Sequence, residues 1–245
     1  MKKLAAQDRS ALIRLASGLS PGSPERRAII AGYFGEVARP SSYEYDDRWD
    51  AESGLEGFND AGIHILDNAR VDDKAKVSDD AKVYDDAEVW GKAKVYDKAE
   101  VYGDAEVYGD AKVNDRAKVY DKAEVYGNAE VYGDAKVYGK AKVYGNAKVC
   151  DEVEVYGKAK VFEDAYVYGN AGVYGNAMVY GDAEVYDGGN VYGNAKVYGD
   201  ARVYGDADVF GNADISGTAV ILGGSWDGSE GPITSGKWDA PGDPA

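Results

Sequence analysis

The sequence contains one cysteine and one histidine, and each scarcity excludes a kind of chemistry. Cys150 has no second cysteine to pair with, so an internal disulfide framework and a cysteine-ligated zinc site are both ruled out. With His64 as the sole histidine, one chain cannot build a site that needs several. No apolar run approaches the roughly 20 residues of a membrane span. We expect no metal, no cofactor and no membrane contact.

Basic residues are also few: 28 Lys and Arg stand against 44 Asp and Glu, a net charge of −16. A field of that sign repels nucleic-acid phosphates, so nucleic acid is not an expected partner. The start, Met1-Lys2-Lys3, resembles the charged beginning of a signal peptide, but Asp8 and Arg9 interrupt the apolar stretch that should follow. We expect a cytoplasmic protein or part of a phage-like particle.

The aromatic composition is one-sided, with 21 Tyr, 4 Phe and 32 Gly, and the cause is a repeat. Residues 63–224 form 27 units of six residues without insertion or deletion. The unit at 105–110 reads Ala-Glu-Val-Tyr-Gly-Asp and is typical. Most units have Ala first, Lys or Glu second, Val third, Tyr fourth, and Gly or Asp fifth.

Each position of the unit has a physical interpretation. Ala and Val, two apart, face the same side of a strand, while the charged residue between them faces the other side. Gly-Asp and Gly-Asn pairs favour turns with positive φ. One short strand and one turn per unit predict a solenoid with parallel strands and a narrow interior filled by side chains. A slip of one residue would bury Lys and Glu, so the register is strongly specified.

The units also carry an aliphatic residue followed four positions later by a small one, as in Val107 with Ala111 and Val131 with Ala135. This pattern resembles the hexapeptide-repeat family of transferase-like proteins, over residues 63–224 only. The resemblance implies a left-handed parallel β-helix of triangular section with three units per coil, hence about nine coils. The expected fold class is an all-β solenoid with a short α-helical N-terminal segment. By resemblance, a homotrimer or other homo-oligomer is the expected assembly.

The flanks divide into three further segments. Residues 1–39 read as two short amphipathic helices with a net charge of +4, residues 40–62 as an acidic aromatic linker or cap, and residues 225–245 as a C-terminal capping tail. The basic segment suits a docking arm to a larger protein assembly, although short termini are commonly tethers or caps. The candidate docking residues are Arg9, Arg14, Arg26 and Arg27.

Seventeen of the 21 tyrosines occupy the fourth position of a unit. Stacked coils would place them in ladders that stabilise a thin core, and rows of tyrosine also make good contact surfaces. Both interpretations can hold together. The predicted interaction surface comprises Tyr84, Tyr102, Tyr120, Tyr138, Tyr156, Tyr174, Tyr192, Trp90, Tyr108, Tyr126 and Tyr144.

The family that the sequence resembles includes acyltransferases and zinc carbonic anhydrases, so both activities have to be considered for this chain. His64 stands at an outward position, and the repeat has no extruded loop to shape a pocket. Cys150 takes a fourth position, where we expect partial exposure and an inert thiol beside Asp151. Stacking Asp86 over Asp104 could attract a cation, but Asp is an ordinary turn former. The sequence therefore favours no catalytic, cofactor or metal site.

The outward charges form blocks if three units make a coil. One column reads Arg70, Glu88, Glu106, Glu124, Lys142, Lys160, Met178 and Lys196. Such a column complements an antiparallel partner or a lattice neighbour, or is simply solvated.

The leading hypothesis is a non-enzymatic structural or interaction protein that docks to an assembly. The alternatives are an acyltransferase with a site between subunits and a binder of an ordered surface such as polysaccharide or ice.

Overall fold

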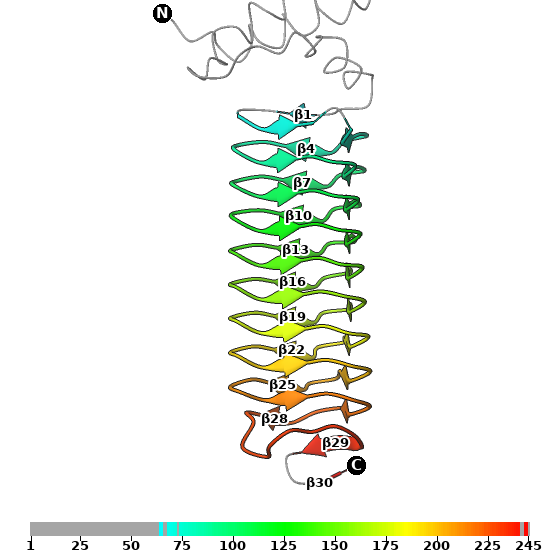
Figure 1. Ribbon diagram of the computed structural model, residues 1–245, viewed down its shortest axis with the longest axis vertical. Coiled ribbons are helices and arrows are strands. Elements are labelled where there is room, and N and C mark those ends of the chain that lie inside the picture. The colour runs from blue at the N-terminus through cyan, green and yellow to red at the C-terminus, as the bar shows by residue number, and fades with distance from the viewer. Residues whose placement is uncertain (1–63, 66–67, 73, 241–242, 245) are drawn as a thin grey trace, which may run out of the picture. The chain divides into compact units, whose positions relative to one another are not determined.

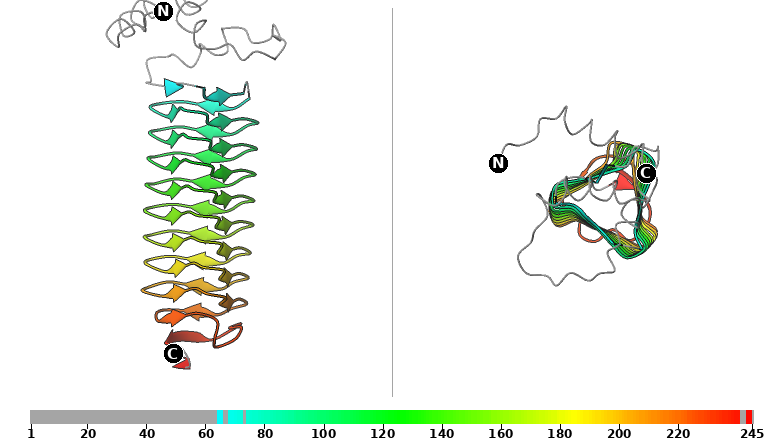
Figure 2. Two further views of the ribbon diagram at one scale, coloured as in Figure 1. Left: turned by 90° about the vertical axis from the view of Figure 1, so that its left-hand side faces the viewer. Right: turned by 90° about the horizontal axis from the view of Figure 1, so that it is seen from above.

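The computed structural model describes residues 64–65, 68–72, 74–240 and 243–244. These residues form a parallel β-solenoid of about nine coils, which confirms the predicted all-β solenoid (Figure 1). Seen along its axis, the solenoid has a triangular outline, with one sheet on each side (Figure 2). The predicted N-terminal helices, the linker and the four candidate arginines lie outside the described residues. The part of the chain described contains no helix long and apolar enough to cross a membrane.

Three sheets are built from strands that recur every third unit. Sheet A contains β1 (His64–Ile65), β4 (Lys82–Val83), β7 (Glu100–Val101), β10 (Lys118–Val119), β13 (Lys136–Val137), β16 (Glu154–Val155), β19 (Gly172–Val173), β22 (Asn190–Val191), β25 (Asp208–Val209) and β28 (Ser225–Trp226). Sheet B contains β2 (Arg70–Val71), β5 (Glu88–Val89), β8 (Glu106–Val107), β11 (Glu124–Val125), β14 (Lys142–Val143), β17 (Lys160–Val161), β20 (Met178–Val179), β23 (Lys196–Val197) and β26 (Asp214–Ile215).

Sheet C completes the triangle and ends in an antiparallel pair, β29 with β30. It contains β3 (Lys76–Val77), β6 (Lys94–Val95), β9 (Lys112–Val113), β12 (Glu130–Val131), β15 (Lys148–Val149), β18 (Tyr166–Val167), β21 (Glu184–Val185), β24 (Arg202–Val203), β27 (Val220–Ile221), β29 (Lys237–Ala240) and β30 (Asp243–Pro244). Along the repeat, each strand pairs in parallel with the strand three units later, as Glu106 with Glu124. Three units per coil are therefore confirmed.

The interior consists of the first and third residues of each unit. From Ala81 to Val185 these alanines and valines are buried, and residues such as Val107 and Ala111 have no exposed surface. Backbone hydrogen bonds join successive coils beside them, as from the N–H of Glu106 to the carbonyl oxygen of Ala123 at 2.9 Å. The core is thus a continuous dry column in which every layer has nearly the same composition.

Past Gly224 the sheets continue without the sequence repeat. Strand β28 pairs with β25, Asp208 with Ser225, in a coil that is one residue shorter than those of the repeat. Trp226 takes the inward place of a valine, is fully buried, and donates its indole N–H to the carbonyl oxygen of Gly223 at 2.7 Å. Trp238 meets it edge to face at 5.9 Å. Large side chains therefore fill the end of the narrow interior.

From Asp79 to Gly217 the turns depend on the fifth residue of each unit, which has positive φ whether it is Gly or an acidic residue. At Gly127 φ is 72°, and an added Cβ would lie 3.0 Å from the carbonyl oxygen of Gly145 in the next coil. Asp97 is accommodated with φ at 59°, and its carboxylate accepts the N–H of Asp115 at 3.3 Å. An acidic side chain thus offsets some of its crowding by satisfying a backbone donor.

We expect Gly127→Ala to destabilise the protein by about 2 kcal/mol, because alanine brings crowding and positive-φ strain without an acceptor. Gly127→Asp should cost less, because its carboxylate can accept the N–H of the next coil. Gly231→Ala is the control for backbone strain alone, since Gly231 has φ at 77° and nothing within 4 Å of an added Cβ. Thermal unfolding followed by circular dichroism checks the order. Equal losses for the two alanine variants would show that coil stacking plays no part.

Candidate functional site: aromatic ladders and charge columns

The fourth residues of successive coils form ladders of parallel rings. The ladder on sheet A runs without a break and consists of Tyr84, Tyr102, Tyr120, Tyr138, Tyr156, Tyr174, Tyr192 and Phe210. The ladder on sheet B is also continuous and consists of Trp90, Tyr108, Tyr126, Tyr144, Phe162, Tyr180 and Tyr198. Ring centroids lie 4.3 to 5.1 Å apart. The predicted tyrosine ladders are therefore confirmed, and all the predicted interaction residues belong to these two ladders.

The rings lie against the sheets and stay partly exposed. Tyr174 covers the backbone of Gly172, its ring 3.4 Å from where a Cβ would stand. Tyr138 donates its hydroxyl to the carboxylate of Glu154 in the next coil at 3.2 Å. Trp90, at the N-terminal end of its ladder, is 41% exposed. The ladders thus combine packing on the solenoid with an accessible aromatic surface.

Burial and nearby carboxylates favour the neutral phenols. Burial, followed by the charge of Glu100, raises the pKa of Tyr84 to about 12. Burial and Glu124 likewise raise the pKa of Tyr108 to about 12. The pKa of Tyr138 is raised by the same two causes, burial and its neighbour Glu154. Forming phenolate charge inside a ladder therefore opposes the folded state.

Sheet C has a shorter ladder, interrupted at Cys150. Tyr168, Tyr186 and Tyr204 stack, whereas Tyr132 is separated from them by the cysteine. Tyr166 fills the gap from the second position: its ring lies 4.5 Å from that of Tyr168, and its hydroxyl lies 3.3 Å from that of Tyr132. The sequence signal for this replacement was a tyrosine standing where Lys or Glu is usual.

The expectation that Cys150 is partly exposed was wrong. The residue is only 1% exposed, because Tyr166 covers the space that the shorter side chain leaves. The thiol lies 3.6 Å from the Tyr166 hydroxyl and 3.6 Å from a carboxylate oxygen of Asp151. Burial raises the pKa of Cys150 more than Asp151 does, while hydrogen bonds from Tyr132 and Tyr166 partly oppose this. The thiol is therefore protected and poorly ionised.

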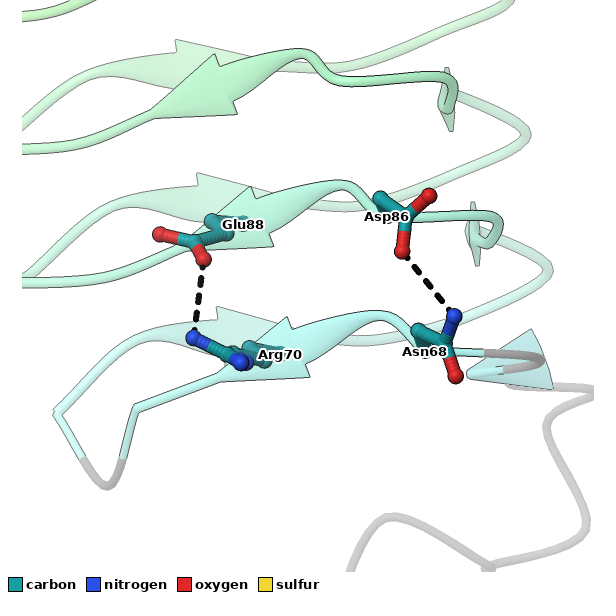
Figure 3. Close-up of polar contacts among 4 residues, drawn as sticks. All are labelled: Asn68, Arg70, Asp86 and Glu88. Atoms are coloured by element: carbon teal, nitrogen blue, oxygen red, sulfur yellow. Dashed lines mark hydrogen bonds and ion pairs between the residues drawn. The ribbon is translucent and has the colours of Figure 1, made fainter. Parts of the chain in front are cut away.

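Outward charges also stack in columns and pair between coils. Arg70 contacts Glu88 at 3.2 Å, and beside this pair Asn68 donates to Asp86 at 3.0 Å (Figure 3). Elsewhere on sheet B, Lys142 and Glu124 lie 2.7 Å apart. Such exposed pairs contribute little stability individually, but they fix where charge remains uncompensated.

The sequence-derived polar candidates do not converge on a reactive centre. His64 lies in β1, in register with Lys82 of β4. Asp104, expected above Asp86, lies 3.2 Å from the ammonium of Lys122. Among the described residues, no group of three or more His, Cys, Asp or Glu side chains is placed to hold a metal ion. A shallow hollow of about 400 Å³ lies on sheet C, lined by Lys76, Ser78, Lys94, Tyr96 and Lys112.

The protein should lose stability as pH rises from about 10 to about 12. Unfolded tyrosines ionise near pH 10, whereas Tyr84, Tyr108 and Tyr168 in the folded chain hold their protons to about 12. The unfolded state thus releases protons first, and the stabilisation present below pH 10 is lost across this window. Phenolate absorbance and circular dichroism should change together. Titration of Tyr84, Tyr108 and Tyr168 near pH 10 in an intact solenoid would contradict this. Tyr108→Phe should raise the pH midpoint of unfolding.

Cys150 should react with a thiol reagent only as the solenoid unfolds. In the native protein we expect Tyr166→Ala to accelerate the reaction by at least tenfold, because it removes the covering ring. Tyr166→Phe keeps the ring and is the matched control, expected to remain slow. Thiol release measured by absorbance checks both. Rapid labelling of the unmodified protein would show that the ring does not protect the thiol.

Comparison with known proteins gives one limited match. A family model described as YdcK Beta solenoid repeat matches residues 171–187, which contain β19, β20 and β21. No curated protein and no solved structure matches the chain. The match agrees with the geometry in supporting a β-helix repeat, and it gives no support to the transferase-like family that the sequence resembles. The chain is a β-solenoid repeat protein, an architecture that fits a structural or interaction role.

Proposed function

We propose that this chain is a non-enzymatic structural or interaction protein, a rigid prism that docks to a larger protein assembly. The observation that carries the proposal is the pair of unbroken ladders on sheets A and B. A ring held on both sides by neighbours loses little conformational entropy on binding, and tyrosine provides large contact area with a polar edge. Regular flat faces suit a protein surface better than a small substrate.

The interior supports the same conclusion. Along the described repeat it is filled by alanine and valine, so this part of the solenoid offers no enclosed cavity for a substrate. The hollow beside Lys94 is shallow and is lined by lysines, a serine and a tyrosine, with no carboxylate or histidine to act as a general base at neutral pH. Docking is assigned to residues 1–39, because their charge of +4 contrasts with the acidic remainder of the chain.

The test is capture of partners from a native extract by the tagged full chain, with mass spectrometry as readout. Reversing the arm charges should reduce recovery of specific partners at least tenfold; the substitutions are Arg9→Glu, Arg14→Glu, Arg26→Glu and Arg27→Glu. The control changes net charge equally on the solenoid, through Lys74→Glu, Lys92→Glu, Lys98→Glu and Lys148→Glu. Undiminished recovery with the arm variant would remove the docking role.

A further inference from the structure

Five consecutive strands of sheet B, from β5 to β17, carry opposite charges in two adjacent blocks, here called the acidic half and the basic half. The acidic half covers the second to fourth coils and consists of Asp86, Glu88, Asp104, Glu106 and Glu124. It also contains one lysine, Lys122, which pairs with Asp104. The basic half covers the next two coils and consists of Lys140, Lys142, Lys158 and Lys160. Figure 3 shows one member of each column of the acidic half, Asp86 and Glu88, on the same coil, above Asn68 and Arg70 of the coil before. The sequence predicted one of these columns, and the fold places the second beside it.

The ends of the glutamate column are compensated within the chain, but its middle is not. Glu88 contacts Arg70, and Glu124 contacts Lys142 across the boundary between the halves. Among the described residues, Glu106 and Lys160 have no ion-pair partner. Glu106 lies in register between two other glutamates, and Lys160 is exposed. Each half therefore has one unneutralised charge of opposite sign in this column, at the same distance from the boundary.

We infer that sheet B binds a second copy of the chain face to face, with the two solenoid axes antiparallel. A two-fold axis between β11 and β14 places β8 opposite β17 of the second copy. Glu106 of each copy then meets Lys160 of the other, so the contact contains this pair twice. The axial repeats match because both copies have the same coil spacing, about 4.8 Å. Charge complementarity at Glu106 and Lys160 is thus built into a single face. The same axis sets Lys122 of each copy opposite Lys140 of the other, and Lys122 is already paired with Asp104 in its own chain.

The aromatic ladder of sheet B fits the same contact. It is the ladder that holds Trp90 and Phe162, and Met178 is an outward apolar residue on the same sheet. The two-fold axis sets Tyr108 against Phe162 of the second copy and Trp90 against its Tyr180. An exposed indole would thus be covered by the dimer. Sheet A lacks this combination, because its ladder contains no tryptophan and its outward column mixes the two signs along its length.

The inference rests on the proposed interaction role and specifies one surface and one partner. It differs from the homotrimer that the family resemblance implies, since a face that binds its own copy across a two-fold axis closes at two chains. The antiparallel dimer also explains why one sign of charge gathers in each half. Coil stability alone does not require this arrangement, because stacked like charges repel modestly.

The experiment is sedimentation equilibrium of the purified full chain at about 0.01 M and about 1 M salt, where the screening lengths are about 30 Å and 3 Å. We expect twice the chain mass at low salt and weaker association at high salt. Glu106→Lys alone, or Lys160→Glu alone, should weaken the dimer about tenfold or more, because each change converts two attractions into repulsions. The double variant, and an equimolar mixture of the single variants, should restore it.

The matched control is Lys94→Glu, which reverses one exposed lysine at the same position of the unit on sheet C and should leave the dimer unchanged. Circular dichroism establishes that each variant is folded. A monomer at every salt concentration, a stoichiometry of three or more, or single-variant losses that the double variant does not restore would each overturn the inference. A monomer that still captures partners through residues 1–39 would leave the proposed function standing, whereas a dimer without partners would leave only the inference.

Discussion

Equal coil length is the constraint on which the molecule depends. Each coil of the repeat takes three units, so every residue lies beside its equivalents in the coils before and after it. Burial of Ala and Val then forms a core that no coil could form alone. One inserted residue would shift the alternation and bring Lys or Glu inward. Stability is shared between neighbouring coils, and the turns must stack as closely as the strands, which explains the many fifth-position glycines.

The same constraint makes the surface a set of columns. A residue type repeated at one position becomes a line along the prism, so tyrosines form ladders and charges form blocks. Lysines and glutamates next to one another in a column form pairs, such as Lys112 with Glu130 at 2.6 Å. Where equal charges follow one another, the column keeps a net field, as at Glu106. Surface electrostatics here thus follows from the coil register more than from local sequence.

A surface of this kind suits recognition by area and regularity. The exposed groups lie on rigid strands, so little order has to be gained on binding, and the repeat multiplies a weak contact along the axis. Catalysis needs unlike groups brought together at one point, whereas the solenoid mainly brings like groups together. The interruption at Cys150 illustrates the difference, because the fold fills the irregular place with the Tyr166 ring and does not open it as a pocket.

The six-residue period by itself determined the short strands, the positive-φ turns, the inward Ala and Val and the outward Tyr, because each depends only on alternation within a unit. The number of units per coil came from family resemblance, since a period of six does not specify how many sides close around the core. Only the tertiary structure decided the cover over Cys150, which Tyr166 in the next coil provides. It alone extended the sheets to Trp226, through a coil shortened by one residue. Both features depend on contacts between coils, for which a single unit carries no signal.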